Sequence, residues 1–285
     1  MRQTPRVVLC LGLPGSASTW IFNVVTQMHG MPRRSLLTGY LDRSFDEFLQ
    51  AIADSEAAID TLIIKSHQAD ASLHRYVAEH RAPCILSVRD PRDCVVSLME
   101  RFDFAFDSAL AAVAKSCHAL LAFASLDVVL LRYEDRFFRS GQTISSLYRY
   151  LQLAEAVDQD KLLFLNGQSA VERFISTFDH FPPGRLARHG DDEYDKVSHW
   201  HRRHFGDGAV GKWRTRLNPE QIAIASESLA DALLRFEYLA DSSDGNDRRD
   251  RSDGSVRRVA DSLSAHAAQS VAEGVAGSAG SDVPH

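Results

Sequence analysis

The sequence has few cysteines and no cysteine pairing pattern, which argues against a disulfide framework and against a cysteine-based zinc site. The four cysteines, Cys10, Cys84, Cys94 and Cys117, form no C-x-x-C pair and lack the ligand spacing of a zinc site. Cys10 and Cys84 lie within apolar runs, where a cysteine usually behaves as a small buried hydrophobe. We therefore expect structural thiols in a reducing compartment and no bound metal.

The chain also lacks a long apolar run and an excess of basic residues. No stretch approaches the roughly 20 apolar residues that span a bilayer. The N-terminal apolar run, residues 7–13, is too short for a signal peptide and ends at Pro14-Gly15. We expect a cytoplasmic protein without stable membrane insertion. The formal net charge of −6 argues against a general nucleic-acid binder, although a local basic pocket for a small anion is compatible with it.

What the chain does contain is the alternation of strands and helices that is typical of an α/β fold. Its 285 residues, 45% of them hydrophobic, suffice for one large domain. Short apolar runs, often β-branched, predict buried parallel strands at residues 7–12, 61–65, 84–88 and 128–132. We expect three layers, with a central parallel sheet flanked by helices as in P-loop NTPases. Helices are predicted at 19–29, 44–58, 71–79, 93–102, 107–124, 143–151, 154–165 and 219–236, with an irregular stretch from 167 to about 192.

The composition changes near Leu239. Residues 241–285 contain no Phe, Tyr or Trp and are rich in Ser, Ala, Gly, Asp and Arg. Such a segment cannot bury enough apolar surface to offset its ordering entropy. We predict a folded domain over residues 1–240 and a disordered tail over 241–285.

The first predicted strand leads through a turn of small residues into a helix. The turn reads Gly12-Leu13-Pro14-Gly15-Ser16-Ala17-Ser18-Thr19-Trp20. Backbone N–H groups and the helix dipole would make an anion site here, with the hydroxyls of Ser16, Ser18 and Thr19 nearby, although an ordinary βα turn explains the same residues. Compared with a Walker motif, Ala17 replaces the second glycine and Ser18 replaces the lysine. A small-molecule kinase therefore lacks its phosphate-binding lysine, whereas a cradle for a shorter 5′ group remains compatible.

A second candidate anion site follows the third predicted strand. Arg89 stands at the end of that strand, where open α/β sheets bind ligands, and Ser97 follows eight residues later on a predicted helix. Both side chains could contact one phosphate, the arginine through its planar fork. The alternative is that Arg89 pairs with Asp90 or Asp93 on the surface.

Five segments, in the same order, resemble motifs of the cytosolic-type PAPS-dependent sulfotransferase family, in which PAPS is 3′-phosphoadenosine 5′-phosphosulfate. Together they extend over about residues 7 to 217, and each is short. The segments are 14–20, resembling the family's 5′-phosphosulfate loop; Ile64-Lys65-Ser66-His67, its Lys-x-His; 89–97, its 3′-phosphate motif; Arg132-Tyr133-Glu134-Asp135, its Tyr-Glu-Asp; and Gly211-Lys212-Trp213-Arg214, its Gly-x-Trp-Lys.

The resemblance implies in-line transfer of the sulfuryl group of PAPS to an acceptor hydroxyl, with adenosine 3′,5′-bisphosphate (PAP) as product and no metal. His67 would be the general base, and Lys65, which projects to the same side of an extended segment, would stabilise the sulfuryl oxygens. Trp20 would stack on adenine and Tyr133 would contact its edge, with a core tryptophan and a buried tyrosine as the structural alternatives. The implied nucleotide-binding set is Gly15, Ser16, Ala17, Ser18, Thr19, Trp20, Arg89, Ser97, Tyr133, Gly208 and Trp213.

Two departures from the family pattern concern positive charge. Gly15 stands where the family has the lysine of its 5′ loop. Gly206 and Asp207 replace the basic pair before Gly208, and we expect Arg202 and Arg203 to supply that charge. The histidine-rich segment 199–204 lacks a zinc spacing, so we interpret it as a basic lid.

The acceptor is not named by the sequence. Segments 99–106 and 167–194 mix aromatic and charged residues, which suits a small-molecule, glycan or lipid-linked acceptor. Two other functions stay open at this point, a P-loop small-molecule kinase and a non-catalytic nucleotide-binding protein. Formation of a homo-oligomer is also left open.

Overall fold

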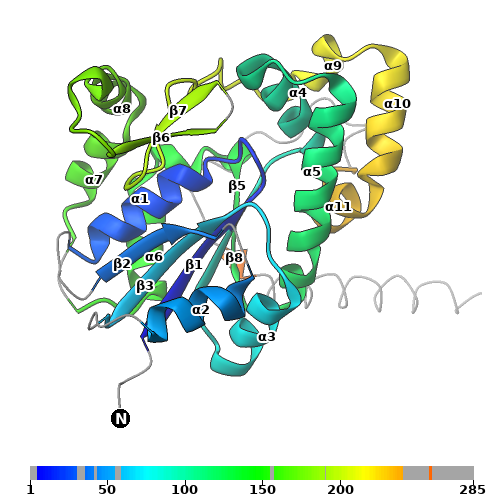
Figure 1. The fold of residues 1–285 in the computed structure, drawn as a ribbon. Coiled ribbons are helices and arrows are strands. Elements are labelled where there is room, and N and C mark those ends of the chain that lie inside the picture. Colours follow the sequence, from blue (N-terminus) through cyan, green and yellow to red (C-terminus); the bar gives the residue numbers. More distant parts are fainter. Residues whose placement is uncertain are drawn as a thin grey trace, which may run out of the picture.

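The computed structural model describes residues 5–30, 36–41, 44–54, 59–154, 157–189, 191–239 and 257–258. Its main sheet has the order β2–β3–β1–β4–β5–β8, and the first five of these strands are parallel (Figure 1). The central parallel sheet confirms the predicted fold class. The strands are β1 (Arg6–Gly12), β2 (Leu36–Tyr40), β3 (Thr61–Ser66), β4 (Cys84–Val88), β5 (Val129–Arg132) and β8 (Arg257–Arg258), the last antiparallel to β5.

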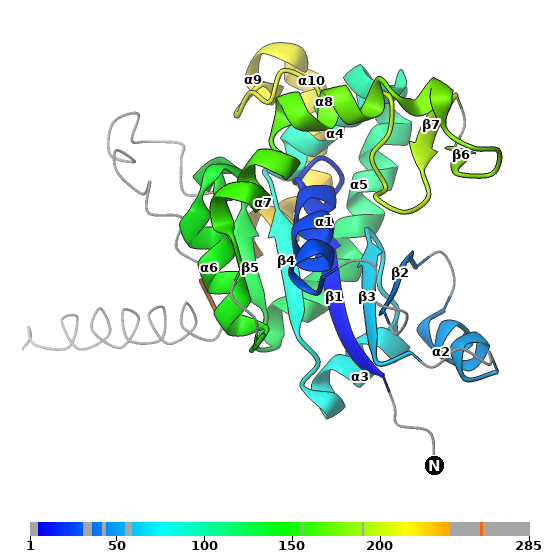
Figure 2. The ribbon, with the colours of Figure 1, turned by 90° about the vertical axis from the view of Figure 1, so that its left-hand side faces the viewer.

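Both faces of the sheet are buried because β1 alternates between two cores. Leu9 and Leu11 belong to one core and Val8 and Cys10 to the other, and all four side chains are fully buried. Burying each leucine contributes about 1.5–3 kcal/mol. Figure 2 shows α1 in front of the sheet and α5 behind it. One face is covered by α1 (Ser18–Met28), α6 (Gly141–Tyr150) and α7 (Gln159–Asn166); the other by α2 (Phe45–Ala53), α3 (Ala71–His80), α4 (Pro91–Phe102), α5 (Phe106–Leu121), α10 (Pro219–Ser228) and α11 (Ala230–Arg235).

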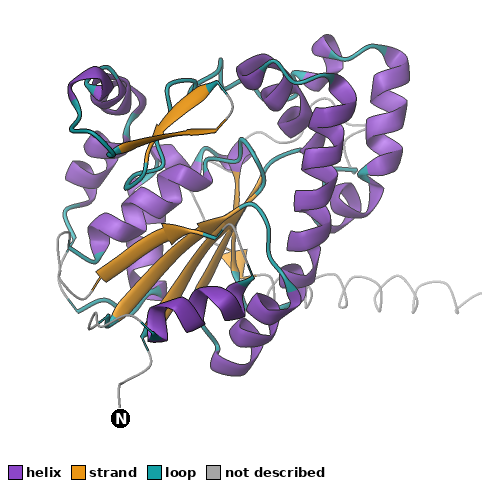
Figure 3. Cartoon of the chain, in the orientation of Figure 1, coloured by secondary structure: helices purple, strands orange, loops and turns teal. Residues whose placement is uncertain are grey.

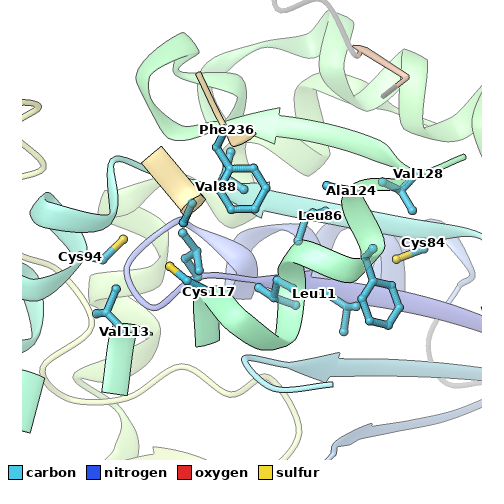
Figure 4. Packing of buried hydrophobic residues seen from close by; sticks show 14 of the residues in the cluster. Leu11, Cys84, Leu86, Val88, Cys94, Val113, Cys117, Ala124, Val128 and Phe236 are labelled. Atoms are coloured by element: carbon cyan, nitrogen blue, oxygen red, sulfur yellow. The ribbon is translucent and has the colours of Figure 1, made fainter. Parts of the chain in front are cut away.

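The core behind the sheet joins β4 to α5. Figure 4 shows Leu86 and Val88 of β4 beside Cys117 of α5, with Phe236 closing the same cluster. All four cysteines are buried free thiols, and burial raises the pKa of Cys117 to about 12.

The stretch Phe106–Ser125 is long and apolar enough to cross a membrane by length and composition. Within its most apolar 18-residue window, 44% is buried, and several residues of its α5 part pack in the core behind the sheet.

The predicted strands are confirmed to within one residue at each end, but three parts of the sheet structure were missed: β2, a two-stranded hairpin, and β8, which lies within the segment predicted to be a disordered tail. Strand β2 has the sequence Leu-Leu-Thr-Gly-Tyr, whose glycine weakens the strand pattern. The stretch 167–192 was predicted to be irregular, and this is wrong. It contains helix α8 (Gln168–Ile175) and strand β6 (Leu186–His189), which pairs with β7 (Asp192–Asp195) in a hairpin (Figure 3). Its strands have four residues each and are rich in charge, so they lack the apolar alternation that marks a strand.

The predicted helices are present, with some ends displaced. Asn218 caps α10 in a capping box with Gln221, and Pro219 is its first residue, as predicted. The single helix expected over 219–236 is divided at Leu229 into α10 and α11. The helix expected from residue 154 begins at Gln159, after the capping side chain of Asp158. The predicted tail, 241–285, lies outside the described residues apart from Arg257–Arg258.

Candidate active site

The loop after β1 forms an anion cradle at the N-terminus of α1. Gly15 and Ala17 have positive φ angles of 75° and 63°, and they flank Ser16 in the alternating pattern of an anion-binding nest. The backbone N–H groups of Gly15, Ala17, Ser18 and Thr19 hydrogen-bond to none of the residues that the structure describes. Helix α1 has no acidic residue in its first turn and no side-chain cap, so its positive end stays uncompensated. This geometry can bind a phosphate or phosphosulfate group.

Ser16 and Gly12 hold this loop from inside. The Ser16 hydroxyl is fully buried, donates to the Leu13 carbonyl at 2.6 Å and contacts Ser87 Oγ at 2.8 Å. A Cβ at Gly12 would lie 2.1 Å from Ser87 Oγ, so only glycine fits this corner. The hydroxyls of Ser18 and Thr19, by contrast, make no hydrogen bond within the described ranges and are the ones available to a ligand.

The carboxyl end of β3 places an imidazole against this loop. His67 Nδ1 lies 2.6 Å from the Gly12 carbonyl, which can only accept, so Nδ1 carries the proton and Nε2 keeps a lone pair. Lys65 Nζ lies 3.4 Å from that Nε2. Burial lowers the pKa of His67 to about 3, and the charge of Lys65 adds to this; burial also lowers the pKa of Lys65 to about 8. At neutral pH the site therefore presents a neutral base beside an ammonium group.

The carboxyl end of β4 brings Arg89 and Ser97 to the same loop. Arg89 is buried and donates to the Gly15 carbonyl at 3.3 Å and to the Ala209 carbonyl at 2.5 Å. A Cβ at Gly15 would lie 3.0 Å from Ser97 Oγ, which places that hydroxyl directly beside the loop. Arg89 also lies 3.6 Å from Asp93, but this pair is buried and not on the surface. The structure thus brings the two predicted anion sites together.

Residues 206–213 cover Arg89 from the other side. The Tyr133 hydroxyl donates to the Gly208 carbonyl at 3.4 Å, and the Arg89 guanidinium lies 4.3 Å from the centre of the Tyr133 ring. Trp213, the first residue of α9 (Trp213–Arg216), donates its Nε1 proton to Asp90 at 3.0 Å and lies under Arg92. Tyr133 and Gly208 therefore lie at the predicted site, whereas Trp213 anchors the loop to α4.

Trp20 lies inside the core next to the cradle. It is 4% exposed and meets the edge of Phe137, with ring centres 5.8 Å apart. Its Nε1 is buried without a hydrogen-bond partner within the described part of the chain. Contact of Trp20 with adenine stays a prediction.

Two arginines that the sequence reasoning missed also reach this region. Arg136 donates to the Gly208 carbonyl at 3.0 Å, next to the Ala209 carbonyl that Arg89 binds. The sequence feature that could have identified Arg136 is its position directly after Tyr133-Glu134-Asp135. Arg101 follows Ser97 by four residues on α4, which places both on one helix face.

The arginines expected to replace the missing basic pair lie elsewhere. Arg202 pairs with Asp179 at 2.5 Å and with Glu193 at 2.8 Å, and Arg203 pairs with Asp103 at 2.9 Å. Both arginines form ion pairs with surface carboxylates, so the expectation that they supply positive charge beside Gly208 is wrong.

A strap, residues 196–212, crosses the carboxyl edge of the sheet from α1 to α4. Asn23 on α1 donates to the Ser198 carbonyl at 2.7 Å, and the Gly211 N–H donates to Asp93 on α4 at 2.6 Å. Burial lowers the pKa values of the strap histidines 199, 201 and 204, and the charge of Lys65 lowers them further. The imidazoles of the predicted basic lid are therefore neutral at pH 7 and lie within electrostatic reach of Lys65. Within the described ranges, no group of three or more His, Cys, Asp or Glu could hold a metal ion.

Comparisons with known proteins add the fold family. No family model matches the sequence, and no curated protein matches it either. A solved structure of mouse sulfotransferase SULT7A1 complexed with PAP matches with a TM-score of 0.59, covering 83% of this chain and 88% of that chain. The chain has the sulfotransferase fold. At 15% identity, the sulfotransferase fold is what this match shows, and any function must be argued from the site itself.

Proposed function

We propose that this chain is a PAPS-dependent sulfotransferase, which moves the sulfuryl group of PAPS to an acceptor hydroxyl and releases PAP. The observation that carries this proposal is the neutral His67, whose Nε2 lies beside the Lys65 ammonium group and whose Nδ1 donates to the Gly12 carbonyl at the start of the anion cradle. A non-catalytic binder would need the anion site but not this base. A kinase would need a lysine at Ser18 in the loop.

The donor would be held at both of its ends. The N–H groups of Gly15, Ala17, Ser18 and Thr19 would bind the 5′ group, with Ser16 supporting the loop from below. Arg89 and Ser97 would bind the 3′-phosphate. Arg136 would add the positive charge that Gly206 and Asp207 lack. Adenine would lie near Trp20 and Tyr133, with Gly208 and Trp213 closing the site.

The residues then account for each part of the transfer. His67 Nε2 accepts the acceptor hydroxyl proton as that oxygen attacks sulfur. The bond between sulfur and the 5′-phosphate oxygen breaks, and PAP leaves with the electron pair. Lys65 turns from Nε2 to the sulfuryl oxygens, whose developing charge it stabilises in a site shielded from water. The loop and Arg89 fix the in-line geometry.

We also propose the setting in which the reaction occurs. The acceptor is a small-molecule, glycan or lipid-linked hydroxyl compound and not a nucleic acid, since the net charge is −6. The unpaired cysteines suit the reducing cytoplasm.

Calorimetry tests the donor site directly. We expect PAP to bind roughly tenfold to a hundredfold more tightly than AMP, because charge-assisted hydrogen bonds to the 3′-phosphate are worth about 1.5–3 kcal/mol. Labelled PAPS should then transfer sulfate to a member of a panel of alcohols, phenols and sugars, whereas ATP with magnesium should give no phosphoryl transfer. Equal affinity for PAP and AMP would refute the proposal.

The pH dependence of kcat/KM for PAPS tests the two catalytic groups. Burial, with the nearby charges of Lys65 and Arg101, lowers the pKa of His67 to about 3, so its base form exists above that pH. The ammonium form of Lys65 is lost above its pKa of about 8. We therefore expect a rate that is flat from about pH 5 to near pH 8 and falls up to tenfold per unit above it. An acid limb centred near 6.5, the usual imidazole value, would show that the base is not this buried histidine.

A further inference from the structure

Arg101 carries a positive charge for which the described residues provide no direct counter-ion. Its Nε donates to the Arg203 carbonyl at 2.8 Å, and its Nη2 donates to His201 Nε2 at 2.9 Å. His201 is itself neutral, since burial lowers its pKa to about 4. Asp192 lies beyond that imidazole, 2.7 Å from its Nδ1. No carboxylate within the described ranges lies at ion-pair distance from Arg101, and its Nη1 hydrogen-bonds to none of those residues.

The charged residues beside Arg101 have ion-pair partners, and Arg101 differs from them in this respect. Arg101 lines an open cleft of about 380 Å³ with Glu100, Asp103, Arg203, Phe205 and Gly206. Glu100 already pairs with Lys212 at 2.5 Å, and Asp103 pairs with Arg203 at 2.9 Å. Among the described residues that line the cleft, Arg101 is therefore the charged residue without an ion-pair partner. A partly buried cation without a partner is costly, so a bound anion would stabilise it.

The position of Arg101 indicates which anion this is. It lies four residues beyond Ser97 on one face of α4, which amounts to about 6 Å along the helix. Its charge lowers the pKa values of both Lys65 and His67, in addition to the larger effect of burial, so it lies within electrostatic reach of the proposed point of transfer. The loop from Gly12 to Trp20 contains no lysine or arginine, and the Gly15 backbone is packed against Ser97. Any cation that joins Lys65 at the transferring group must therefore come from another element.

We propose that Arg101 binds the sulfuryl oxygens of PAPS, at the junction between the donor site and the cleft, and is a catalytic residue. This inference rests on the proposed function. The planar guanidinium presents Nη1 toward tetrahedral oxygens, a geometry that suits sulfate-like groups. No proton moves to or from Arg101: the bond from sulfur to the 5′-phosphate oxygen breaks, the bond to the acceptor oxygen forms, and His67 takes the proton. Burial lowers the pKa of Arg101 only to about 10, so it stays charged throughout.

The test compares two ligands that differ by the sulfuryl group, without an acceptor. Calorimetry with Arg101→Gln should show PAPS affinity falling roughly tenfold or more, because a charge-assisted contact is lost, while PAP affinity is retained. The variant Arg101→Lys keeps the positive charge but lacks the planar guanidinium, so it should bind PAPS more tightly than Arg101→Gln and less tightly than the parent protein. The kcat of Arg101→Gln should fall by roughly a hundredfold.

Three results would overturn the inference. Equal losses of PAPS and PAP affinity would show a structural role for Arg101. Unchanged affinity for both, with a raised KM for acidic acceptors, would place an acceptor anion at Arg101. Unchanged affinity and unchanged kinetics would leave Arg101 without a ligand. Failure of the Arg101 inference can be distinguished from failure of the proposed function by measurements on the parent protein. If the parent protein prefers PAP to AMP, the proposed donor site stands, whatever the Arg101 variants show.

Discussion

Replacing His67 with alanine should lower kcat for sulfuryl transfer by roughly 10²–10⁴-fold, the usual contribution of a general base, while PAP still binds. The reason is that Nε2 is the nitrogen that carries the lone pair, fixed in that state because Nδ1 donates to the Gly12 carbonyl. The variant His67→Asn sharpens the test. Its amide can still donate to Gly12, but it has no basic nitrogen, so it should be as slow as the alanine variant. Single-turnover assays with labelled PAPS measure both.

The control for this experiment is His74→Ala. His74 lies on α3 against the Phe123 ring, with ring centres 5.3 Å apart, and far along the chain from the cradle. Its loss should leave kcat at the parent value. If His67→Asn transferred sulfate at the parent rate, His67 would not be the base, and the proposed mechanism would fail even with PAP binding intact.

Replacing Arg89 with methionine should raise the Kd for PAP by roughly tenfold to a hundredfold, equivalent to about 1.5–3 kcal/mol for hydrogen bonds to a charged group. Arg89 joins the Gly15 carbonyl to the Ala209 carbonyl beside Ser97, and under the proposed function its guanidinium binds the 3′-phosphate. Asp93 keeps the N–H groups of Gly211 and Trp213 after the change, so it is not left unsatisfied. Calorimetry with PAP and with AMP measures the effect.

The comparison between ligands makes the Arg89 experiment specific. AMP lacks the 3′-phosphate, so its affinity should change little, and a loss of equal size for both ligands would contradict the assignment. The matched variant is Arg92→Met. Arg92 pairs with Asp90 at 2.8 Å and lies over the Trp213 ring, so its loss should lower the midpoint of thermal unfolding yet preserve the preference for PAP.

The sequence predicted those parts of the site that follow directly from a strand end. Lys65, His67 and Arg89 stand at or just beyond the carboxyl ends of β3 and β4, and parallel strands bring such ends to one edge. Gly15 and Ala17 were likewise placed correctly, because a turn of small residues before a helix has few other geometries.

The remainder depends on tertiary contacts that local patterns do not encode. Arg101 and Arg136 matter because the strap lies against them, and the strap's course is fixed by Asn23 and Asp93, both distant in the chain. Arg202 and Arg203 stood closer in sequence to the missing basic pair, but the acidic residues of the β6–β7 hairpin and of the loop after α4 bind them first. Because the hairpin was not predicted, the pairing of Arg202 with Glu193 could not be foreseen.

The hydrogen bond from His67 to Gly12 ties the proposed base to the anion cradle, whereas Phe205 lines the cleft and takes no part in the proposed transfer. If the proposed function holds and the acceptor enters through this cleft, we expect exchange of Phe205 to change which alcohol is accepted while His67 keeps its tautomer and position. Acceptor preference would then be open to change, by evolution or by an engineer, without replacement of the groups that carry out the transfer.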